Sequence, residues 1–411
     1  MSNNNNIGIS LMNNYNINLE FVIDLLKKLN SKSSEERNIG EQILSMIKKD
    51  EKLYKILLEI SVSQSELSTP NIKVQSLLIL KSLIKQDNNN NNKVKGLDYN
   101  LKNNNNQLND IYNFLKREFL IYLSSGNYIK IIDNHIKEII LLLSDKFFPD
   151  EWNELNKFFI EFFEKKTEIF FYKNSYDISI YLMSLFYSIL KIFSKKKNIN
   201  KFFKYKDNYL NSYISYYKGI IHFFNEIIYN FDNIEIFSKC LKFLLFNDKI
   251  LCLLIGISYN QSTFQKDKNI LLMIKFILER TGNIINEIEK VSNDEIKDIL
   301  HHNLYKNLKL INFLQSTNPI LFCYDLQLYI EILFFLISNC EKYKENTIKI
   351  VIFSLTKIMN TSTYKETFEI EKPLNENFIE NISKISETQK KKKKRKNTKI
   401  TFKFICFSYK I

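Results

Sequence analysis

The residue types that most often carry chemistry are sparse in this sequence, and their spacing does not match a catalytic centre. The four histidines are His135, His222, His301 and His302. Adjacent residues on a helix point about 100° apart, so His301 and His302 would not easily share a metal ion. No HExxH sequence accompanies them. The histidine pattern therefore predicts no metal site.

The cysteines are also not arranged as a functional set. They are Cys240, Cys252, Cys323, Cys340 and Cys406, an odd number with no CxxC pair. This pattern argues against a disulfide framework or a zinc site and fits a reducing compartment. We expect these side chains to act mainly as small buried apolar groups.

Phosphate-binding and nucleophile motifs are missing as well. The seven glycines are scattered, and none belongs to a GxxxxGK, GxGxxG or GxSxG sequence. Because every common catalytic pattern is absent, the sequence predicts a protein that is not an enzyme and needs no cofactor.

The composition indicates a helical protein with a substantial core. The 411 residues are 45% apolar and include 33 Phe and 23 Tyr, but only 7 Gly and 4 Pro. Many-stranded β folds need frequent Gly and Pro at their turns, so a sandwich or barrel is disfavoured. The chain has no Ala and has 52 Asn and 55 Lys against 4 Arg, as expected from A+T-rich codons. A single Lys or Asn therefore carries little functional meaning.

The net charge of +14 comes mainly from the end of the chain. All 45 acidic residues precede Lys390, and residues 1–389 hold 49 Lys plus Arg, which leaves this body at +4. A near-neutral body argues against nucleic-acid binding except through the tail. The basic run consists of Lys390, Lys391, Lys392, Lys393, Lys394, Arg395 and Lys396. We interpret it as a nuclear localisation signal or polyanion contact; a solvated tail enriched in Lys is the alternative.

Helical periodicity begins at Leu19 and continues to about residue 360. Leu19, Val22, Ile23 and Leu26 share one helix face. Further helices are predicted after a Ser33–Glu36 capping box, over 53–60, after Thr69-Pro70, and over 111–119, 132–143, 152–162, 176–194, 203–230, 232–247, 266–289, 293–315, 320–339 and 344–360. The longest strongly apolar stretch, 178–190, has 13 residues and is too short to span a bilayer. With no signal peptide at its start, the chain is predicted to be soluble and intracellular.

These helices pair off with short joints and predict an all-α fold. The expected architecture is a HEAT/armadillo-like right-handed superhelical solenoid of antiparallel helix pairs, with units of ~40 residues. A compact irregular helical bundle is the alternative. The predicted organisation is a disordered N-terminus (1–18), helical repeats (19–165) with a disordered Asn-rich loop (87–107), further HEAT-like repeats (166–362) and a Lys-rich tail (363–411).

Two sequence blocks carry a more specific pattern. The first contains Gly40-Glu41-Gln42-Ile43-Leu44, then 53–60, then Lys73-Val74-Gln75-Ser76 through Lys81-Ser82-Leu83-Ile84. The second is Phe147-Phe148-Pro149-Asp150-Glu151-Trp152-Asn153-Glu154-Leu155. From the residues alone, Pro149 and Trp152 would lock a turn between stacked helices, and a ligand-stacking role for Trp152 is the alternative.

The two blocks resemble the N-terminal domain of importin-β-type nuclear transport receptors. That family has an A-E-x-x-L-like helix, a helix ending in Leu-Leu-x-Ile, a third helix with a Lys-Asn-x-Ile pattern, and Asp-Phe-Pro-x-x-Trp-x-x-Leu after its third repeat. Here Gly40 and Ser76 replace Ala, Ser82 replaces Asn and Phe147 replaces Asp. The resemblance covers about 130 residues. Among the branches it is most similar to the importin seven/eight type or to the exporter that recycles importin-α.

The resemblance implies a nuclear transport receptor that binds the small GTPase Ran in its GTP form. It also implies Phe-Gly nucleoporins and protein cargo as partners, no membrane insertion, and a location in the nucleus, cytoplasm and nuclear pore. The second helices of the early pairs would lie near 52–63, 71–86 and 128–146. The candidates for the Ran-facing surface are Lys73, Lys81, Lys85, Lys130, Lys137 and Glu138. A helical-repeat scaffold without Ran binding, or polyanion binding through the tail, remains the alternative.

Overall fold

The computed structural model describes residues 16–48, 50–62, 69–93, 102–126, 130–165, 176–195, 209–210, 212–220, 233–258, 268–323 and 325–361. Every regular element in these ranges is a helix, which confirms the all-α prediction. The chain divides into two compact units, Met1–Ile221 and His222–Ile411. The predicted boundary after residue 165 differs from this division and falls inside the first unit.

Several predicted features lie outside the described residues. They include the first fifteen residues of the expected N-terminal disordered segment, the Lys-rich tail 363–411 and its basic run Lys390–Lys396. Residues 16–18 are described, and Asn18 already caps the first helix, since its side chain accepts a hydrogen bond from the Phe21 backbone amide at 2.9 Å. The described residues therefore include the N-cap just before the predicted helix start at residue 19.

The first unit is built from successive helices joined by short connections. They are α2 (Leu19–Leu29), α3 (Ser34–Ile47), α4 (Glu51–Val62), α5 (Pro70–Lys93), α6 (Lys102–Ser125), α7 (Lys130–Phe147), α8 (Asn153–Lys165) and α9 (Tyr176–Phe193). Both predicted N-caps are present: the Ser33 hydroxyl accepts from the Glu36 amide, and the Thr69 hydroxyl accepts from the Ile72 amide, each at 3.4 Å. The reciprocal half of the predicted Ser33–Glu36 capping box is not formed, because the Ser33 amide donates to the Ser31 hydroxyl at 3.1 Å. Each cap satisfies a backbone amide that the helix itself cannot.

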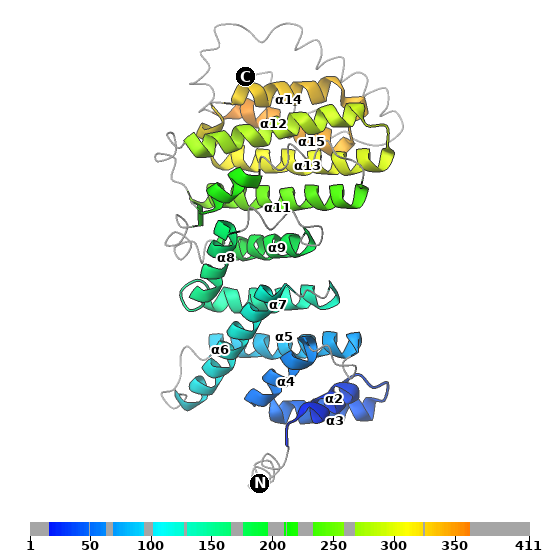
Figure 1. The fold of residues 1–411 in the computed structure, drawn as a ribbon, viewed down its shortest axis with the longest axis vertical. Helices are drawn as coiled ribbons and strands as arrows, with labels where there is room; N and C mark the ends of the chain where they lie inside the picture. The colour runs from blue at the N-terminus through cyan, green and yellow to red at the C-terminus, as the bar shows by residue number, and fades with distance from the viewer. Residues whose placement is uncertain are drawn as a thin grey trace. The chain divides into compact units, whose positions relative to one another are not determined.

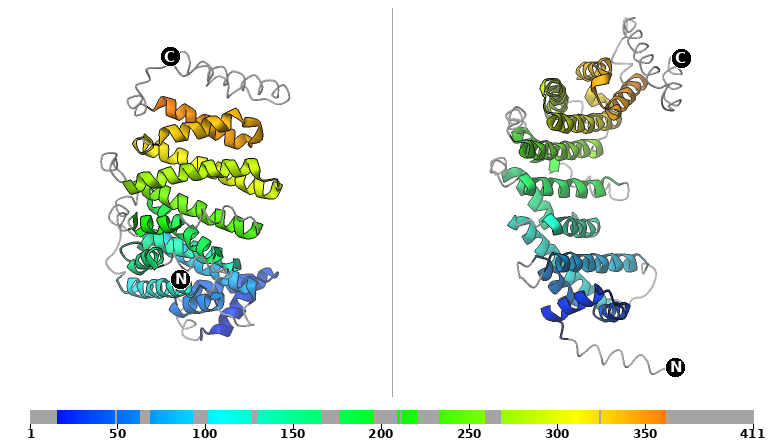
Figure 2. Two further views of the ribbon diagram at one scale, coloured as in Figure 1. Left: turned by 45° about the horizontal axis from the view of Figure 1, so that its top comes forward. Right: turned by 90° about the vertical axis from the view of Figure 1, so that its right-hand side faces the viewer.

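These helices form two layers. In one layer α4 packs on α6 and α6 on α8; in the other, α5 packs on α7 and α7 on α9. The pairs α4–α5 and α6–α7 connect the layers, and Figures 1 and 2 show α5, α7 and α9 following one another in the stack. The sequence analysis predicted that 52–63, 71–86 and 128–146 are the second helices of successive pairs, and this prediction is wrong for 52–63. Because α4 pairs with α5 across a short connection, it belongs to the opposite layer.

The Asn-rich insertion is shorter than the predicted loop 87–107. Helix α5 extends through Lys93 and α6 begins at Lys102, so both ends of the predicted loop are helical, and residues 94–101 lie outside the described residues. Asn costs a helix only ~0.7 kcal/mol per residue or less relative to Ala, so a helix already formed can propagate into an Asn run.

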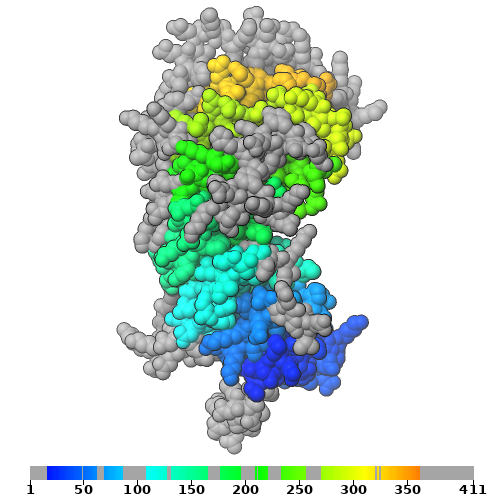
Figure 3. Space-filling view, in the orientation of Figure 1, coloured from blue at the N-terminus to red at the C-terminus, as the bar shows by residue number. Residues whose placement is uncertain are grey.

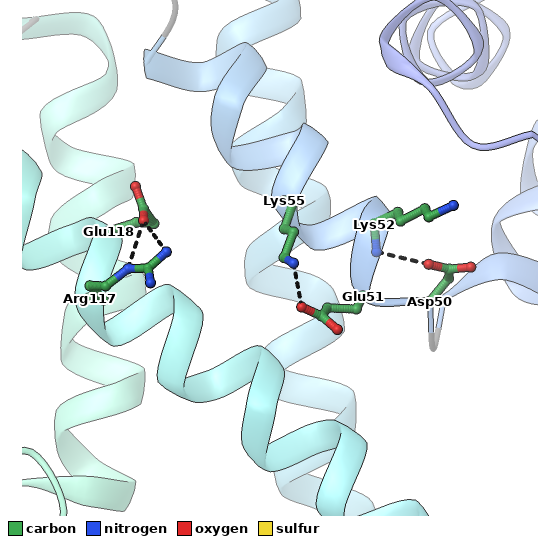
Figure 4. A network of polar contacts seen from close by, with 6 residues as sticks. All are labelled: Asp50, Glu51, Lys52, Lys55, Arg117 and Glu118. Atoms are coloured by element: carbon green, nitrogen blue, oxygen red, sulfur yellow. Dashed lines mark hydrogen bonds and ion pairs between the residues drawn. The ribbon is translucent and has the colours of Figure 1, made fainter.

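The ion pairs within α4 and within α6 join residues that are close in sequence. Figure 4 shows the Asp50 carboxylate accepting from the Lys52 amide at 2.8 Å and Lys55 paired with Glu51 one turn away. On α6, Arg117 pairs with its neighbour Glu118 at 2.9 Å. The space-filling view shows α6 (cyan) in continuous contact with the preceding blue helices. Exposed pairs of this kind contribute little to stability.

The turn between α7 and α8 is a buried aromatic corner. The side chains of Phe147, Phe148, Pro149, Trp152 and Leu155 are all buried, and Trp152 has no exposed surface. The Phe148–Pro149 peptide bond is cis. The centre of the Phe148 ring lies 5.2 Å from the centre of the Phe193 ring at the end of α9. A fully enclosed indole cannot stack on a ligand, so the structural interpretation of Trp152 is confirmed.

Replacing Trp152 by Ala should therefore destabilise the first unit. A large buried aromatic costs ~3–5 kcal/mol when truncated to Ala. The measurement is urea unfolding followed by circular dichroism, with Ile131→Ala as control because Ile131 is 57% exposed. If both variants unfold at the same urea concentration, the corner does not hold α7 and α8 together.

Helix α9 is the helix in the described ranges that is long and apolar enough to cross a membrane, with a mean hydropathy of 1.3 over 18 residues. It is longer than the 13-residue stretch expected from sequence. Half of this window is buried, and α9 packs on α7. Core helices of water-soluble proteins meet the same criterion, so this helix alone does not indicate a membrane span.

The second unit repeats the two-layer plan. Its elements are α11 (Ile234–Ser258), α12 (Lys268–Lys290), α13 (Asp294–Thr317), η4 (Pro319–Phe322), α14 (Leu326–Ser338), η5 (Cys340–Lys342) and α15 (Glu345–Asn360). Helix α13 packs between α11 and α15 in one layer, while α12 packs on α14 in the other. Helix α11 continues well past the predicted end at 247.

An ion pair lies inside this unit. Asp248 on α11 accepts a hydrogen bond from Arg280 on α12, and their side chains are only 1% and 2% exposed. Burial, followed by the charge of Asp248, raises the pKa of the Cys252 thiol well above its ordinary value. Cys240 and Cys252 are buried as expected, whereas Cys323 and Cys340 are half-buried.

Removing one charge of the Asp248–Arg280 pair should lower the free energy of unfolding strongly. Removing both charges should lower it by less than the sum of the two single changes. Asp248→Leu or Arg280→Met alone leaves an uncompensated buried charge, which costs ~3–5 kcal/mol. The double variant should lose clearly less than the sum of the two, as measured by urea unfolding of all four proteins in a double-mutant cycle. Additive losses would show that the two side chains do not depend on each other.

Candidate protein-interaction surface

The exposed stripes of α5, α7 and α9 form the candidate site of the first unit. Helix α7 packs between α5 and α9 in its layer and on α6 of the other layer, and α5 also packs on α4. Exposed residues with helical spacing remain on these helices. On α7 the stripe includes Ile131, Asn134, Glu138 and Asp145. We call the combined stripes the α5–α7–α9 face.

A row of polar contacts crosses this face. Lys81 of α5 forms an ion pair with Glu138 of α7, and Lys137 of α7 donates a hydrogen bond to the Ser184 hydroxyl of α9. His135 lies beside the first pair, with its Nδ1 3.9 Å from the Glu138 carboxylate. Three helices that are distant in sequence are therefore linked by side chains that also face solvent.

The electrostatics of Glu138 reflect this arrangement. The hydrogen bond from Lys81 is the main cause that holds the pKa of the Glu138 carboxyl below its ordinary value. Burial is the second cause and opposes it, while the charges of Lys81, His135 and Lys85 act in the same direction as the hydrogen bond. Glu138 is thus the anionic centre of a mostly cationic row. Its side chain remains 51% exposed.

A second set of contacts fixes the start of α7. The Tyr122 hydroxyl of α6 donates to the Asp133 carboxylate at 2.6 Å, and the Tyr181 hydroxyl of α9 donates to the Asp133 backbone carbonyl at 3.2 Å. These bonds tie α6, α7 and α9 together beside the polar row. They hold the register in which Lys137 meets Ser184.

A groove of about 530 Å³ lies between α3 and α5, beside this face. Its lining includes the apolar side chains of Leu29, Leu44, Ile79 and Leu83 and the charged residues Glu41 and Lys48. Leu78 in this groove is 45% exposed. The groove and the polar row share α5, so a partner lying along α5 would meet both.

Helices α2 and α3 approach each other closely beside this groove, and this explains why position 40 is a glycine. A Cβ added at Gly40 would lie 3.1 Å from the Leu29 side chain and 3.2 Å from the Leu29 backbone nitrogen. The neighbouring helix would have to move by a few tenths of an ångström to accept Ala. Gly40 therefore permits tighter packing than the Ala of the family pattern.

The structure brings together half of the residues predicted for the Ran-facing surface. Lys81, Lys137 and Glu138 lie in the polar row. Lys85 is close enough for its positive charge to lower the pKa of the Glu138 carboxyl. Lys73 lies near the start of α5, half-buried and about two turns from Lys81. Lys130 begins α7, but its side chain lies outside the described residues.

Sequence reasoning missed two parts of this surface. It did not find the α3–α5 groove, because a gap between helices depends on how they pack. It also missed Ser184, because no pattern marks a single serine on an apolar helix. In the part of the chain that the structure describes, no group of three or more His, Cys, Asp or Glu side chains is placed to hold a metal ion.

Comparisons with known proteins add no identification. No model of a known protein family matches the sequence, and no curated protein matches it significantly. The resemblance to nuclear transport receptors therefore rests on the two sequence blocks alone.

The polar row should contribute little to folding stability. Replacing Glu138 by Gln should lower the free energy of unfolding by less than ~1 kcal/mol, because the Glu138 side chain is half-exposed to solvent. Since the folded-state pKa of Glu138 is lowered, its contribution is present above the unfolded pKa and is lost as pH falls through the folded value. Urea unfolding at neutral and acidic pH measures both effects. A loss of several kcal/mol would mean that the row is needed mainly for folding.

Proposed function

We propose that the chain is a helical-repeat protein-interaction module of the nuclear transport receptor type. The paired helices and their two-layer stacking within each unit support a HEAT/armadillo-like solenoid of antiparallel pairs with the right-handed superhelix of that class. The observation that carries the proposal is the polar row Lys81–Glu138 and Lys137–Ser184, which links three stacked helices yet stays open to solvent. Such a surface suits recognition of a folded protein partner.

The proposed partner of the α5–α7–α9 face is the small GTPase Ran in its GTP form. Lys81, Lys85 and Lys137 would contact acidic groups of the partner, and the adjoining α3–α5 groove would accept an apolar side chain. Binding of Ran and of cargo would be coupled, so the nucleotide state would set the direction of transport. Phe-Gly nucleoporins would meet the opposite layer, and the protein would act in the nucleus, the cytoplasm and the nuclear pore without metal, cofactor or catalysis.

The test is binding of the full-length protein to purified Ran loaded with a non-hydrolysable GTP analogue or with GDP, measured by calorimetry. The GTP form should bind at least ~10-fold more tightly, a difference of ~1.4 kcal/mol or more. Lys81→Glu combined with Lys137→Glu should abolish this preference. Lys157→Glu is the matched control, because Lys157 is an exposed lysine on α8 in the other layer.

The outcomes separate the proposals. No binding to either form, from protein shown to be helical by circular dichroism, would contradict the receptor proposal and leave a helical-repeat scaffold for another protein. Equal binding to both forms would also contradict it. Binding that the double variant does not affect would place the Ran site elsewhere on the chain.

A further inference from the structure

The second unit exposes a face that is basic and aromatic at once. Helices α11, α13 and α15 form one layer, and each leaves one stripe open. These stripes carry Lys242 and Lys249 on α11, Lys306 and Lys309 on α13, and Phe353 and Lys357 on α15. We call them the basic-aromatic face.

Side chains link the stripes across the helix boundaries. Lys357 of α15 donates a hydrogen bond to the Ser316 hydroxyl of α13. His302 of α13 lies near both Lys306 and Lys249; burial lowers its pKa first, and the charges of Lys306, Lys344 and Lys249 lower it further. The three stripes therefore form one continuous surface.

The lysines of this face lie beside aromatic rings. The Lys249 ammonium lies 4.7 Å from the Phe246 ring centre, and the Lys357 ammonium lies 5.3 Å from that of Phe353. Lys306 and Lys309 both approach the Tyr305 ring, at 5.7 and 5.8 Å. The attraction between an ammonium group and a ring orients the lysine side chain and leaves its own positive charge unchanged.

Exposed acidic residues are missing from the parts of these helices that carry Lys249, Lys306, Lys309 and Lys357. The sequence has no Asp or Glu in residues 299–324 or 346–361. On α11 beyond Glu235 the only acid is Asp248, which is buried against Arg280. Across the described ranges, no ion pair involves Lys242, Lys306, Lys309 or Lys357. The acids of α11, α13 and α15 otherwise lie near their N-terminal ends.

Exposed apolar surface accompanies this positive charge. Phe313 of α13 is 41% exposed and Phe353 of α15 is 56% exposed, on adjacent helices. Large apolar side chains left open next to unneutralised lysines require a partner that offers both carboxylates and apolar groups.

We propose that the basic-aromatic face binds an acidic peptide segment of a partner protein that also carries Leu or Phe side chains. Its carboxylates pair with Lys306, Lys309 and Lys357, and its apolar side chains pack on the open Phe rings. Single-stranded nucleic acid fits less well, because the lysines lie over ring faces on which bases would stack. This inference concerns the second unit and does not depend on Ran binding.

The experiment uses full-length protein and a fluorescein-labelled peptide that repeats Glu-Glu-Leu-Glu-Glu-Phe. Its matched control has Gln in place of every Glu. Fluorescence anisotropy should show the Glu peptide binding at least ~10-fold more tightly than the Gln peptide, with affinity that falls as salt rises. Labelled oligouridylate is the nucleic-acid probe.

Variants locate the binding site. Lys309→Glu with Lys357→Glu should weaken Glu-peptide binding at least ~10-fold, since each reversal turns an attraction into a repulsion. Phe353→Ala should weaken it less, with normal folding because the ring is exposed. Lys275→Glu is the control, since Lys275 is an exposed lysine on α12 in the other layer.

Each alternative outcome overturns the proposal. No binding of the Glu peptide, or equal binding of both peptides, would remove the charge complementarity on which it rests. Tighter binding of oligouridylate, weakened by the Lys309→Glu and Lys357→Glu double reversal, would make the face a nucleic-acid surface. Peptide binding that Lys275→Glu weakens as much as the double reversal would show general attraction to positive charge.

Discussion

The structure depends on one packing constraint. Helices such as α7 and α13 are flanked by two neighbours of their own layer and pack on a helix of the other layer, which leaves one open stripe. On α13, Leu304 and Leu308 point into the unit, while Lys309 and Phe313 lie on the stripe that remains. Because the core fixes which side chains are buried, it also fixes which residues of successive helices stand side by side on the surface. Both candidate surfaces follow from this rule.

The two surfaces differ in how their charges are balanced. On the α5–α7–α9 face, Lys81 is paired with Glu138, so the surface is ordered and close to neutral at that point. On the basic-aromatic face, Lys309 and Lys357 lie against rings and lack acidic neighbours. Inside the second unit, by contrast, the Asp248–Arg280 pair is closed off from solvent. A charge that is buried must be paired, whereas an exposed charge can be left for a partner.

Much of the fold could be predicted from the sequence, because local signals set it. The Thr69 cap, the break at Pro149 and the spacing of Leu19, Val22 and Ile23 all act within a few residues. The layer to which α4 belongs could not be predicted, since it depends on contacts between distant helices. The site was predicted only in part for the same reason: Lys81 and Glu138 are 57 residues apart, and nothing local says that they meet. The basic-aromatic face was not predicted, because lysines are frequent throughout the chain and those on this face did not stand out. The stretch 299–324, which has no Asp or Glu, could have indicated it.

The most direct test of this account is zero-length carbodiimide cross-linking of the full-length protein, followed by mass spectrometry. This reagent joins only amines and carboxylates that touch, so it reports which helices are neighbours. The layered stacking predicts a Lys81–Glu138 link within the first unit, and Lys342–Glu289 and Lys344–Asp298 links within the second. If Lys81 gives no link to Glu138 while the Lys342–Glu289 and Lys344–Asp298 links form, α5 does not stack on α7 in this way, and the surface built on that stacking is wrong.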